Sequence, residues 1–313
     1  MVRQIAAHPD EFTLVGGWDP DARLAARRRE EWRPTIDVPM YESVEALLAE
    51  PLDGVVVEGI VADNLAHARE ALRRGLPVLL EKPFGTDLAE ARETFDLARR
   101  KGLHLQLAYL FRYMSAVEEM LTRARRGDIG HVYEFRARLP KDLNLYAEHV
   151  DTLGRYAGGI FFEMAGHVID FMCSVLGRPR EIQRLLGHHH PSAPGSFVDN
   201  GVALFRFDRA LGIVEVPALE IVPDQRRIEI YGTDGALVIP HMGSGHLAND
   251  AVQPLDVWTR DAGRWERHDL KAAMLQIRDL REFAAVVRGA KRPNYTLEHD
   301  LMVQEALLAA SGM

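Results

Sequence analysis

The sequence has 313 residues, of which 47% are hydrophobic and 27% charged, and this length and composition favour two globular domains over one. A formal net charge of -8 leaves little to attract the phosphates of a nucleic acid, which we exclude as a partner. Cys173 is the only cysteine, so neither an intramolecular disulfide nor a thiolate metal cluster can form. The chain lacks an apolar run of ~20 residues and a secretory start, so we expect a cytoplasmic protein that does not bind a membrane.

The first third of the chain alternates short apolar runs with charged amphipathic segments, a pattern typical of βαβ units around a parallel sheet. Turn residues such as Asp53-Gly54, Gly75 and Lys101-Gly102 separate the segments. We expect strands at residues 12–18, 54–57, 78–80 and 103–108, and helices at 22–31, 66–74 and 88–101. Residues 1–112 are therefore predicted to form an α/β domain around a parallel sheet.

Beyond residue 112 the predicted strands become longer and alternate in polarity, which indicates a second domain with a mostly antiparallel sheet. We assign residues 113–313 to this second α/β domain, with the C-terminal helix packing back on the first domain. Strands are expected at 131–139, 201–207, 211–221, 227–230, 236–239, 256–259 and 265–270, and helices at 115–126, 158–176, 271–288 and 297–310.

An acidic residue, Asp19, follows the apolar run 12–18 and is placed at the carboxyl end of the first predicted strand. A carboxylate at that end of a parallel sheet can accept hydrogen bonds from both hydroxyls of an adenosine ribose, and it repels a 2′-phosphate. Asp21 adds a second negative charge, which favours NAD over NADP. The competing interpretation is an aspartate that only caps the helix starting at Ala22 or forms a turn.

A lysine, Lys82, comes directly after the apolar strand 78–80 and precedes Pro83, which keeps the local chain out of a helix. Partial desolvation at a strand end can lower the pKa of a lysine enough for it to exchange a proton with a substrate hydroxyl. Glu81 would balance the charge or hold a cofactor hydroxyl. An ordinary surface ion pair at a turn is the alternative for this tripeptide.

Polar residues also interrupt the most apolar predicted helix. Glu163 and His167 are four apart and share one face, and Asp170 follows three residues later. Burying such groups in an apolar helix costs free energy unless they are paired with a partner or take part in binding or catalysis. A core histidine satisfied by a carboxylate and a zinc site are the alternatives, and we favour no metal because no further ligand group is evident.

Three consecutive histidines, residues 188–190, precede Pro191, Pro194 and Gly195. Neighbouring side chains cannot easily face one ion, and no carboxylate is placed near them in the sequence. We therefore predict a solvated loop here rather than a metal site.

Several further segments complete a recognisable series along the chain: Val15-Gly16-Gly17-Trp18-Asp19-Pro20-Asp21, Asn64-Leu65-Ala66-His67, Gly75-Leu76-Pro77-Val78-Leu79-Leu80-Glu81-Lys82-Pro83, Phe111-Arg112-Tyr113, residues 158–170, and Ile228-Glu229-Ile230-Tyr231-Gly232-Thr233-Asp234-Gly235. In their order and spacing they resemble the glucose-fructose oxidoreductase and inositol dehydrogenase (Gfo/Idh/MocA) family over nearly the whole chain. The resemblance implies a Rossmann domain followed by an α/β domain with an open, mainly antiparallel sheet.

The resemblance also implies roles for particular residues. Lys82 would be the catalytic lysine and His167 the catalytic histidine that binds the reacting hydroxyl, with Glu163 where the family usually has aspartate. The cofactor side would be lined by Asp19, Asn64, His67 and Glu81. From their place near the domain junction or just before the Glu163 helix, we expect substrate-pocket residues at Arg112 and Tyr156, with Tyr146 and His149, although each could equally be a surface or packing residue. Asp170 is assigned to the substrate as well. A hydride would pass from the substrate to C4 of the nicotinamide while Lys82, helped by His167, accepts the hydroxyl proton.

The chain departs from the family pattern at its start, because Met1-Val2-Arg3-Gln4-Ile5 aligns inside the first helix. The first strand and the Gly-x-Gly-x-x-Gly loop are therefore expected to be missing, a truncated Rossmann domain. Residues 58–63 also form a longer segment than the usual loop before Asn64.

We expect an NAD-dependent oxidoreductase, with NADP the less favoured cofactor, that acts on a sugar, a cyclic polyol or a sugar derivative. A non-catalytic ligand-sensing or scaffold protein of the same fold is the first alternative, and a lyase or hydrolase that cycles a tightly held NAD is the second. A homo-oligomer, dimer or tetramer, is implied by the resemblance, and apolar alternation at Val202-Leu204 and Val214-Val216 is compatible with it.

Overall fold

The computed structural model describes residues 1–33, 36–143, 150–191, 193, 195, 197–218, 225–243, 251–272 and 275–313. Contacts divide the chain into two compact units. Unit 1 contains residues 1–85, 89–108 and 276–294, and unit 2 contains residues 86–88, 109–275 and 295–313. The main division thus falls between Ala108 and Tyr109, four residues before the expected boundary, and a segment near the C-terminus returns to unit 1.

Unit 1 is built on a parallel sheet of three strands in the order β1-β2-β3, β1 being Val55–Val57, β2 Val78–Leu80 and β3 Leu105–Leu107. The side chains of β2 and β3 are all buried, as their continuous apolar runs predict. The helices α4 (Val61–Arg73) and α5 (Leu88–Lys101) connect successive strands. The helices α1 (Val2–Ala6), α2 (Ala22–Trp32) and α3 (Val44–Leu47) precede them.

Residues 12–18 do not form the strand that their composition predicts. The segment is extended, but it makes a single parallel bridge, between Gly17 and Met40. The bridge uses hydrogen bonds from Gly17 N to Pro39 O and from Tyr41 N to Gly17 O, each 2.9 Å long. None of these residues is fully buried. Two successive glycines and the following Asp-Pro turn give the segment little side-chain packing to extend this ladder.

The C-terminal part of unit 1 is α9 (Leu275–Val287), which packs on the sheet. Leu280 and Phe283 of α9 form a buried apolar cluster with Leu79 and Ala108. Beside it, Gln106 Nε2 of β3 donates to Asp279 Oδ1 at 2.6 Å, and both side chains are buried. The expected return of a C-terminal helix to the first domain therefore applies to α9, whereas the last helix, α10 (Leu297–Ser311), lies in unit 2.

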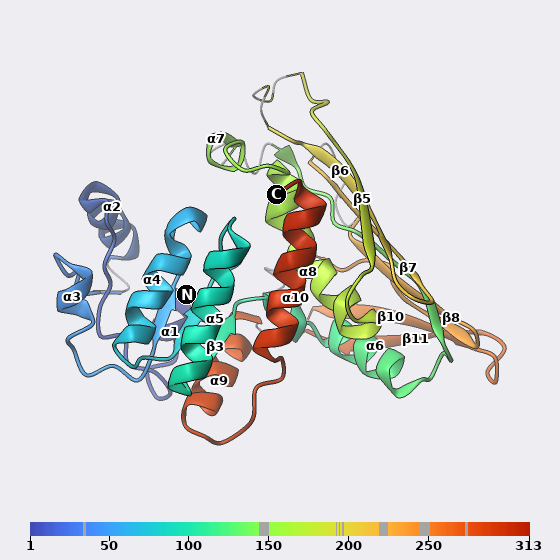
Figure 1. Cartoon of the computed structure of the whole chain (residues 1–313). Helices are drawn as coiled ribbons and strands as arrows, with labels where there is room; N and C mark the ends of the chain where they lie inside the picture. Colours follow the sequence, from blue (N-terminus) through green and yellow to red (C-terminus); the bar gives the residue numbers. More distant parts are fainter. Residues whose placement is uncertain are drawn as a thin grey trace. The chain divides into compact units, whose positions relative to one another are not determined.

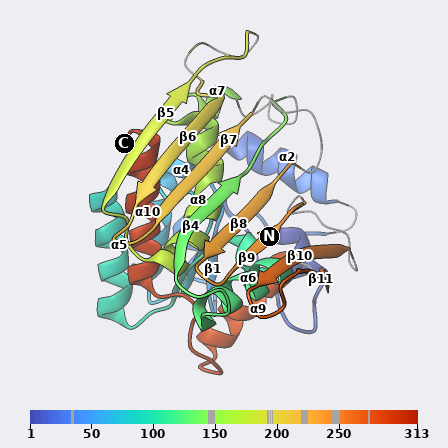
Figure 2. The same cartoon turned by 90° about the vertical axis from the view of Figure 1, so that its right-hand side faces the viewer.

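Unit 2 contains an eight-stranded sheet in the order β11-β10-β9-β8-β4-β7-β6-β5, which Figure 2 shows from its broad side. Its strands are β4 (Val132–Arg138), β5 (Glu181–Gly187), β6 (Asn200–Arg206), β7 (Leu211–Pro217), β8 (Arg227–Gly232), β9 (Gly235–Ile239), β10 (Val252–Thr259) and β11 (Trp265–Lys271). Neighbours pair antiparallel except β4 with β7. This confirms the predicted mixed fold. The edge strand β5 was not predicted, because most of its side chains are exposed and no apolar alternation marks it.

Helices cover one face of this sheet. The central one is α8 (Gly159–Leu176), against which α10 packs, and α6 (Ser115–Arg126) lies beside it (Figure 1). By length and composition α8 is apolar enough to cross a membrane, but it is mostly buried within the protein, as core helices are. A short helix, α7 (Val150–Leu153), precedes it, and a 3-10 turn, η1 (Leu110–Tyr113), packs against it.

Candidate active site

Lys82 lies in a turn at the carboxyl end of β2 in unit 1. The preceding residue continues the strand ladder, because Glu81 N donates to Val57 O of β1 at 2.9 Å. Glu81 and Lys82 are half-buried, and the Lys82–Pro83 peptide bond is cis. The lysine therefore stands where the strand leaves the sheet, with its side chain partly withdrawn from water.

The two residues after Pro83 anchor this turn. Phe84 is fully buried and packs against Phe95 of α5, with ring centroids 5.3 Å apart. Gly85 is buried with φ of +114°, and a Cβ there would lie 2.5 Å from Leu65 Cδ1 of α4. Only glycine fits this conformation and this space. Phe84 and Gly85 were not among the predicted site residues, although an aromatic residue followed by glycine is visible in the sequence directly after Lys82-Pro83.

Asp19 and Asp21 form the turn before α2. Asp19 Oδ1 accepts the Asp21 backbone N–H at 2.8 Å, and Asp21 Oδ1 accepts those of Arg23 and Leu24. Asp21 is thus the N-cap of α2. One Asp19 oxygen therefore accepts a hydrogen bond within the turn, which agrees with the alternative that Asp19 is a turn aspartate. The same hydrogen bond fixes the direction of the Asp19 carboxylate.

Asn64 and His67 lie in the amino-terminal half of α4. Asn64 is buried, and its Oδ1 accepts the Gly59 N–H at 3.0 Å. The ring of His67 meets Trp18 edge-on, with centroids 5.3 Å apart. The supposed long loop before Asn64 is partly helix, since α4 begins at Val61. Because Trp18 precedes Asp19, this contact brings the Asp19 turn close to α4 within unit 1.

Glu163, His167 and Asp170 lie on α8 in unit 2, as the predicted helix requires. Glu163 is half-buried, and His167 is 5% exposed. The His167 ring stacks on Phe111 of η1, with centroids 4.2 Å apart and planes inclined by 28°. Tyr109 meets the same ring edge-on at 5.8 Å. The histidine ring is therefore confined by aromatic side chains from the segment before Arg112.

Arg112 and Asp170, which were expected near substrate, are bonded to each other inside unit 2. Arg112 donates from Nε to Asp170 Oδ2 at 2.9 Å and from Nη2 to Asp170 Oδ1 at 2.6 Å. Nη2 also donates to Asp300 Oδ1 at 2.6 Å, and His299 Nε2 lies 2.7 Å from Asp170 Oδ1. The Tyr295 ring covers the guanidinium at 3.7 Å. We call these five residues the Arg112 cluster: Arg112, Asp170, Tyr295, His299 and Asp300.

The charges of the Arg112 cluster separate the pKa values of its two carboxyl groups. Burial raises the pKa of Asp170, but Arg112 and His299 outweigh it and hold that pKa at about 2. Burial dominates at Asp300 and raises its pKa despite the same guanidinium. Asp170, His299 and Asp300 have ligand atoms within 4.8 Å of one another, as in a metal site. The cation they hold is Arg112, so this geometry gives no separate metal site.

The C-terminal members of the Arg112 cluster were missed from the sequence. Asp170 and His299 are 129 residues apart, and no local pattern links them. The visible signal was the pair His299-Asp300 near the start of a predicted helix with many apolar residues, since charges buried in such a helix require partners.

Other predicted residues lie apart from these contacts. Tyr156 is half-buried and packs on Phe162, with ring centroids 5.7 Å apart. Tyr146 and His149 lie outside the described residues. The expectation that no carboxylate accompanies histidines 188–190 was wrong, because the buried Asp199 accepts the backbone N–H groups of His189 and His190. These bonds hold the backbone of His189 and His190, and Asp199 also lies 3.5 Å from His188 Nδ1. Residues 192, 194 and 196 lie outside the described part.

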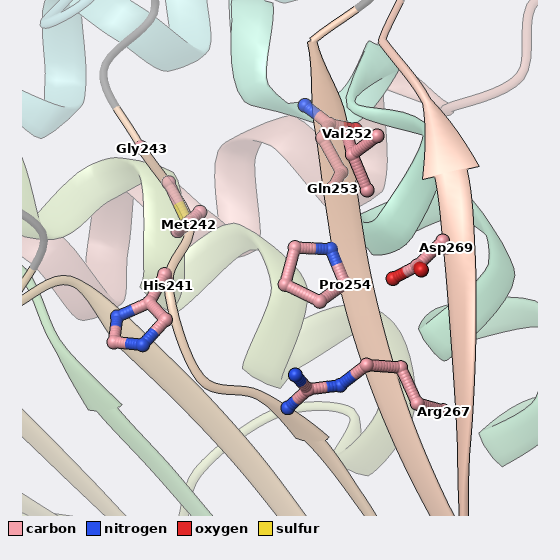
Figure 3. A pocket seen from close by; sticks show the side chains of 8 residues that line it. All are labelled: His241, Met242, Gly243, Val252, Gln253, Pro254, Arg267 and Asp269. Atoms are coloured by element: carbon pink, nitrogen blue, oxygen red, sulfur yellow. The ribbon is translucent and has the colours of Figure 1, made fainter.

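A pocket of about 440 Å³ opens in unit 2 beside β10 and β11 (Figure 3). Gln253 and Pro254 line it from β10, and Arg267 and Asp269 line it from β11. Arg267 is already bonded to Asp256 through Nε at 2.7 Å and Nη2 at 2.8 Å. None of the predicted site residues lines this pocket, and the adjacent residues 244–250 lie outside the described part of the chain.

Comparison with known proteins identifies both units. Residues 1–109 match the family described as "Oxidoreductase family, NAD-binding Rossmann fold", and residues 117–238 match "GFO/IDH/MocA C-terminal domain". The chain belongs to the Gfo/Idh/MocA family of oxidoreductases. The resemblance found in the sequence is thereby confirmed.

Individual relatives show the breadth of this Gfo/Idh/MocA family. Trans-1,2-dihydrobenzene-1,2-diol dehydrogenase of Macaca fascicularis is 31% identical over 174 residues, covering 53% of this chain and 51% of the relative. The chain spans about half the length of the curated dehydrogenases of this name that it matches. An oxidoreductase from Agrobacterium radiobacter, solved with NAD+, L-tartaric acid and magnesium, has a TM-score of 0.81 at 17% identity, covering 99% of this chain and 91% of that chain. A 3-ketoreductase from Actinomadura kijaniata, solved with NADP, has a TM-score of 0.76 at 21% identity and the same coverage. The solved structures confirm the fold.

Proposed function

We propose that the chain is a nicotinamide-dependent oxidoreductase that transfers a hydride between the cofactor and a CH–OH group of a sugar, a cyclic polyol or a sugar derivative. The observation that carries this proposal is Lys82, half-buried at the carboxyl end of a parallel strand and held there by the buried Phe84 and Gly85. The macaque relative supports the substrate class, since its name gives a cyclic diol as substrate.

Lys82 is assigned the proton transfer. A neutral lysine takes the proton of the substrate hydroxyl when the alcohol is oxidised, and the ammonium returns it when a ketone is reduced. When bound, the nicotinamide supplies or accepts the hydride at C4. His167 is assigned to bind the same hydroxyl, and Glu163, one turn earlier on α8, to assist the proton transfer. The buried Phe84 and Gly85 fix the backbone from which the Lys82 side chain extends, which favours a productive geometry.

NAD is the cofactor that the residues around Asp19 favour. The Asp19 carboxylate is fixed by the Asp21 N–H, and its other oxygen can accept a ribose hydroxyl. The nearby charge of Asp21 repels a 2′-phosphate, which disfavours NADP. Glu81 and His67 are assigned to the cofactor side as well. Asn64, bonded to Gly59, is assigned to hold the loop after β1 in shape for the cofactor.

The test is a calorimetric titration of the full chain with NAD, NADH and NADP, followed by assays of hydride transfer with a panel of sugars and cyclic polyols. Binding of NAD ahead of NADP, with turnover of at least one polyol class, is the expected result. If no cofactor binds at millimolar concentration, the proposed dehydrogenase activity is refuted for this chain and the ligand-sensing alternative is favoured.

The lysine assignment is tested with Lys82→Ala, for which we expect unchanged NAD affinity and a turnover lower by on the order of 10²- to 10⁴-fold. Lys101→Ala is the matched control, because Lys101 is an exposed lysine at the end of α5 in the same unit. Retained turnover in Lys82→Ala would remove the lysine from its role.

We further propose a cytoplasmic homo-oligomer that uses the outer face of the unit 2 sheet. Leu204 and Leu211 are exposed on that face, and Ile213 pairs with Leu204 across β6 and β7. Val214 and Val216 do not contribute, since both point into the core. Light scattering of Leu204→Glu is expected to show a smaller assembly than the unaltered chain; an unchanged mass would exclude this face.

A further inference from the structure

The Arg112 cluster joins η1, α8 and α10 at one buried point in unit 2. Arg112 comes from η1, Asp170 from α8, and His299 and Asp300 from α10. The side chains of Arg112 and Asp170 are 3% and 0% exposed, and that of Asp300 is 4% exposed. Because a planar guanidinium forms two parallel bonds with one carboxylate, it fixes orientation as well as distance.

The same two elements that this ion pair joins also meet at His167. Phe111, which stacks on the His167 ring, directly precedes Arg112, and His167 lies three residues before Asp170 on α8. Residues three apart on a helix face the same side. The Phe111–His167 stack and the Arg112–Asp170 pair are therefore neighbouring contacts of one interface, and a shift of η1 that breaks one displaces the other.

We propose that Arg112 and Asp170 are positioning residues that fix the plane of the His167 ring through Phe111, and that they do not contact substrate. The proposal rests on the proposed function, in which His167 binds the reacting hydroxyl. Tyr109 supports the same ring from its edge, and its position depends on Gly166, where a Cβ would lie 3.3 Å from the Tyr109 ring and hydroxyl.

The bonding of Arg112 is what argues against a substrate contact. Its Nε and Nη2 point at carboxylates, and the rings of Tyr295 and Tyr109 lie 3.7 Å and 4.8 Å from its central carbon. A substrate could bind Nε or Nη2 only by breaking a buried ion pair, which leaves uncompensated charge in the core, and the side chain as a whole is 3% exposed. If Arg112 only holds Phe111 in place, its ion pair can stay intact during the reaction.

The first measurement is the NMR signal of the His167 ring, identified among the 13 histidines by its loss in His167→Gln. Stacking on Phe111 shifts the ring protons upfield, and Phe111→Leu calibrates that shift. We expect Asp170→Asn to lose most of this upfield shift and Arg112→Lys to lose part of it. Asp279→Asn is the matched control, because it alters a buried carboxylate bonded to Gln106 in unit 1, and the His167 signal is expected to stay in place.

The second measurement is steady-state kinetics of the same variants. A displaced His167 lowers kcat by on the order of 10- to 100-fold while the substrate KM changes little. Arg112→Lys keeps the positive charge but cannot form the two parallel bonds to Asp170. Its kcat is expected to lie between that of the unaltered chain and that of Asp170→Asn. A raised KM at unchanged kcat would instead show a substrate contact and overturn the proposal.

Tyr295→Leu covers the case in which Asp170→Asn does not fold, because it uncovers the guanidinium without leaving a buried charge unpaired. A partial loss of the His167 ring shift supports the proposal, and an unshifted His167 signal in folded variants contradicts it. If the chain shows no turnover at all, the proposed function fails, while the NMR result still decides whether the Arg112 cluster positions His167.

Discussion

Lys82 and His167 are held in place by different chemistry in their two units. In unit 1 the turn that carries Lys82 is fixed by apolar contacts, through Phe84 against Phe95 and Gly85 against Leu65. In unit 2 the segment stacked on His167 is fixed by the ion cluster around Arg112. Truncating a buried apolar side chain lowers stability in proportion to the volume removed, and this loss does not depend on pH. A buried ion pair is instead lost when one partner loses its charge. Comparing the two anchors therefore separates packing from charge within one molecule.

Phe84→Ala is expected to give the largest loss of stability, about 4 kcal/mol in the free energy of unfolding, because it empties a fully buried aromatic site. The loss should be the same at about pH 7 and about pH 4, since no titrating group is removed. Urea denaturation of the full chain at both values measures it. A loss that varies with pH would show that the Lys82 turn also depends on charge.

Asp170→Asn should lower the free energy of unfolding by about 3 kcal/mol near neutral pH, because it leaves the Arg112 charge underpaired in the core. The folded pKa of Asp170, about 2, lies below its ordinary 3.8, so its contribution is complete above about pH 4 and is lost as the pH falls toward 2. The gap between the unaltered chain and the variant should thus narrow by about 2 kcal/mol over that window. Denaturation curves at several acidic pH values measure this gap, and a constant gap would refute the assignment.

Asp300→Asn is expected to be milder, at about 1 kcal/mol, although it touches the same guanidinium. Burial raises the pKa of Asp300, so its ionised form is the less favoured of the two carboxylates, and a neutral amide replaces it with smaller loss. Parallel denaturation of the two asparagine variants gives the comparison. Equal losses in the free energy of unfolding would mean that Asp170 and Asp300 stabilise the Arg112 guanidinium to the same extent.

Arg180→Ala should have the smallest effect. Arg180 forms a two-bond pair with Asp208, like that of Arg112, but both side chains are more than half exposed. Solvent screening and side-chain entropy cancel most of the attraction in such a pair. We expect an unchanged midpoint of urea denaturation, and a clear shift would show that the bidentate geometry matters without burial.

The elements that the sequence predicts best are those whose apolar residues match the burial of the folded element, as a continuous run in a strand or at helical spacing in a helix. The strand at 78–80 and the helices at 88–101 and 115–126 match β2, α5 and α6 to the residue. Residues 12–18 look like a strand by composition, but they form one bridge and none of them is fully buried. The edge strand β5 has no alternation of apolar and polar residues that would predict it, because most of its side chains are exposed to solvent.

The candidate site divides in the same way. Lys82 follows from its place after an apolar strand, and Glu163, His167 and Asp170 follow from helical spacing. The pairing of Asp170 with Arg112, His299 and Asp300 depends on three elements meeting in the folded chain, and no local rule gives that meeting. Sequence spacing therefore found the polar residues of α8 and could not tell which of them are already bonded.

The return of α9 to unit 1 makes that unit discontinuous along the chain. Leu79 and Ala108 have their apolar partners Leu280 and Phe283 almost at the other end of the sequence. During synthesis from the amino terminus, the sheet that carries Lys82 must therefore wait, with this surface uncovered, until residues 276–294 have left the ribosome. Unit 1, although it contains the earlier residues, can be completed only after nearly all of unit 2 has been made.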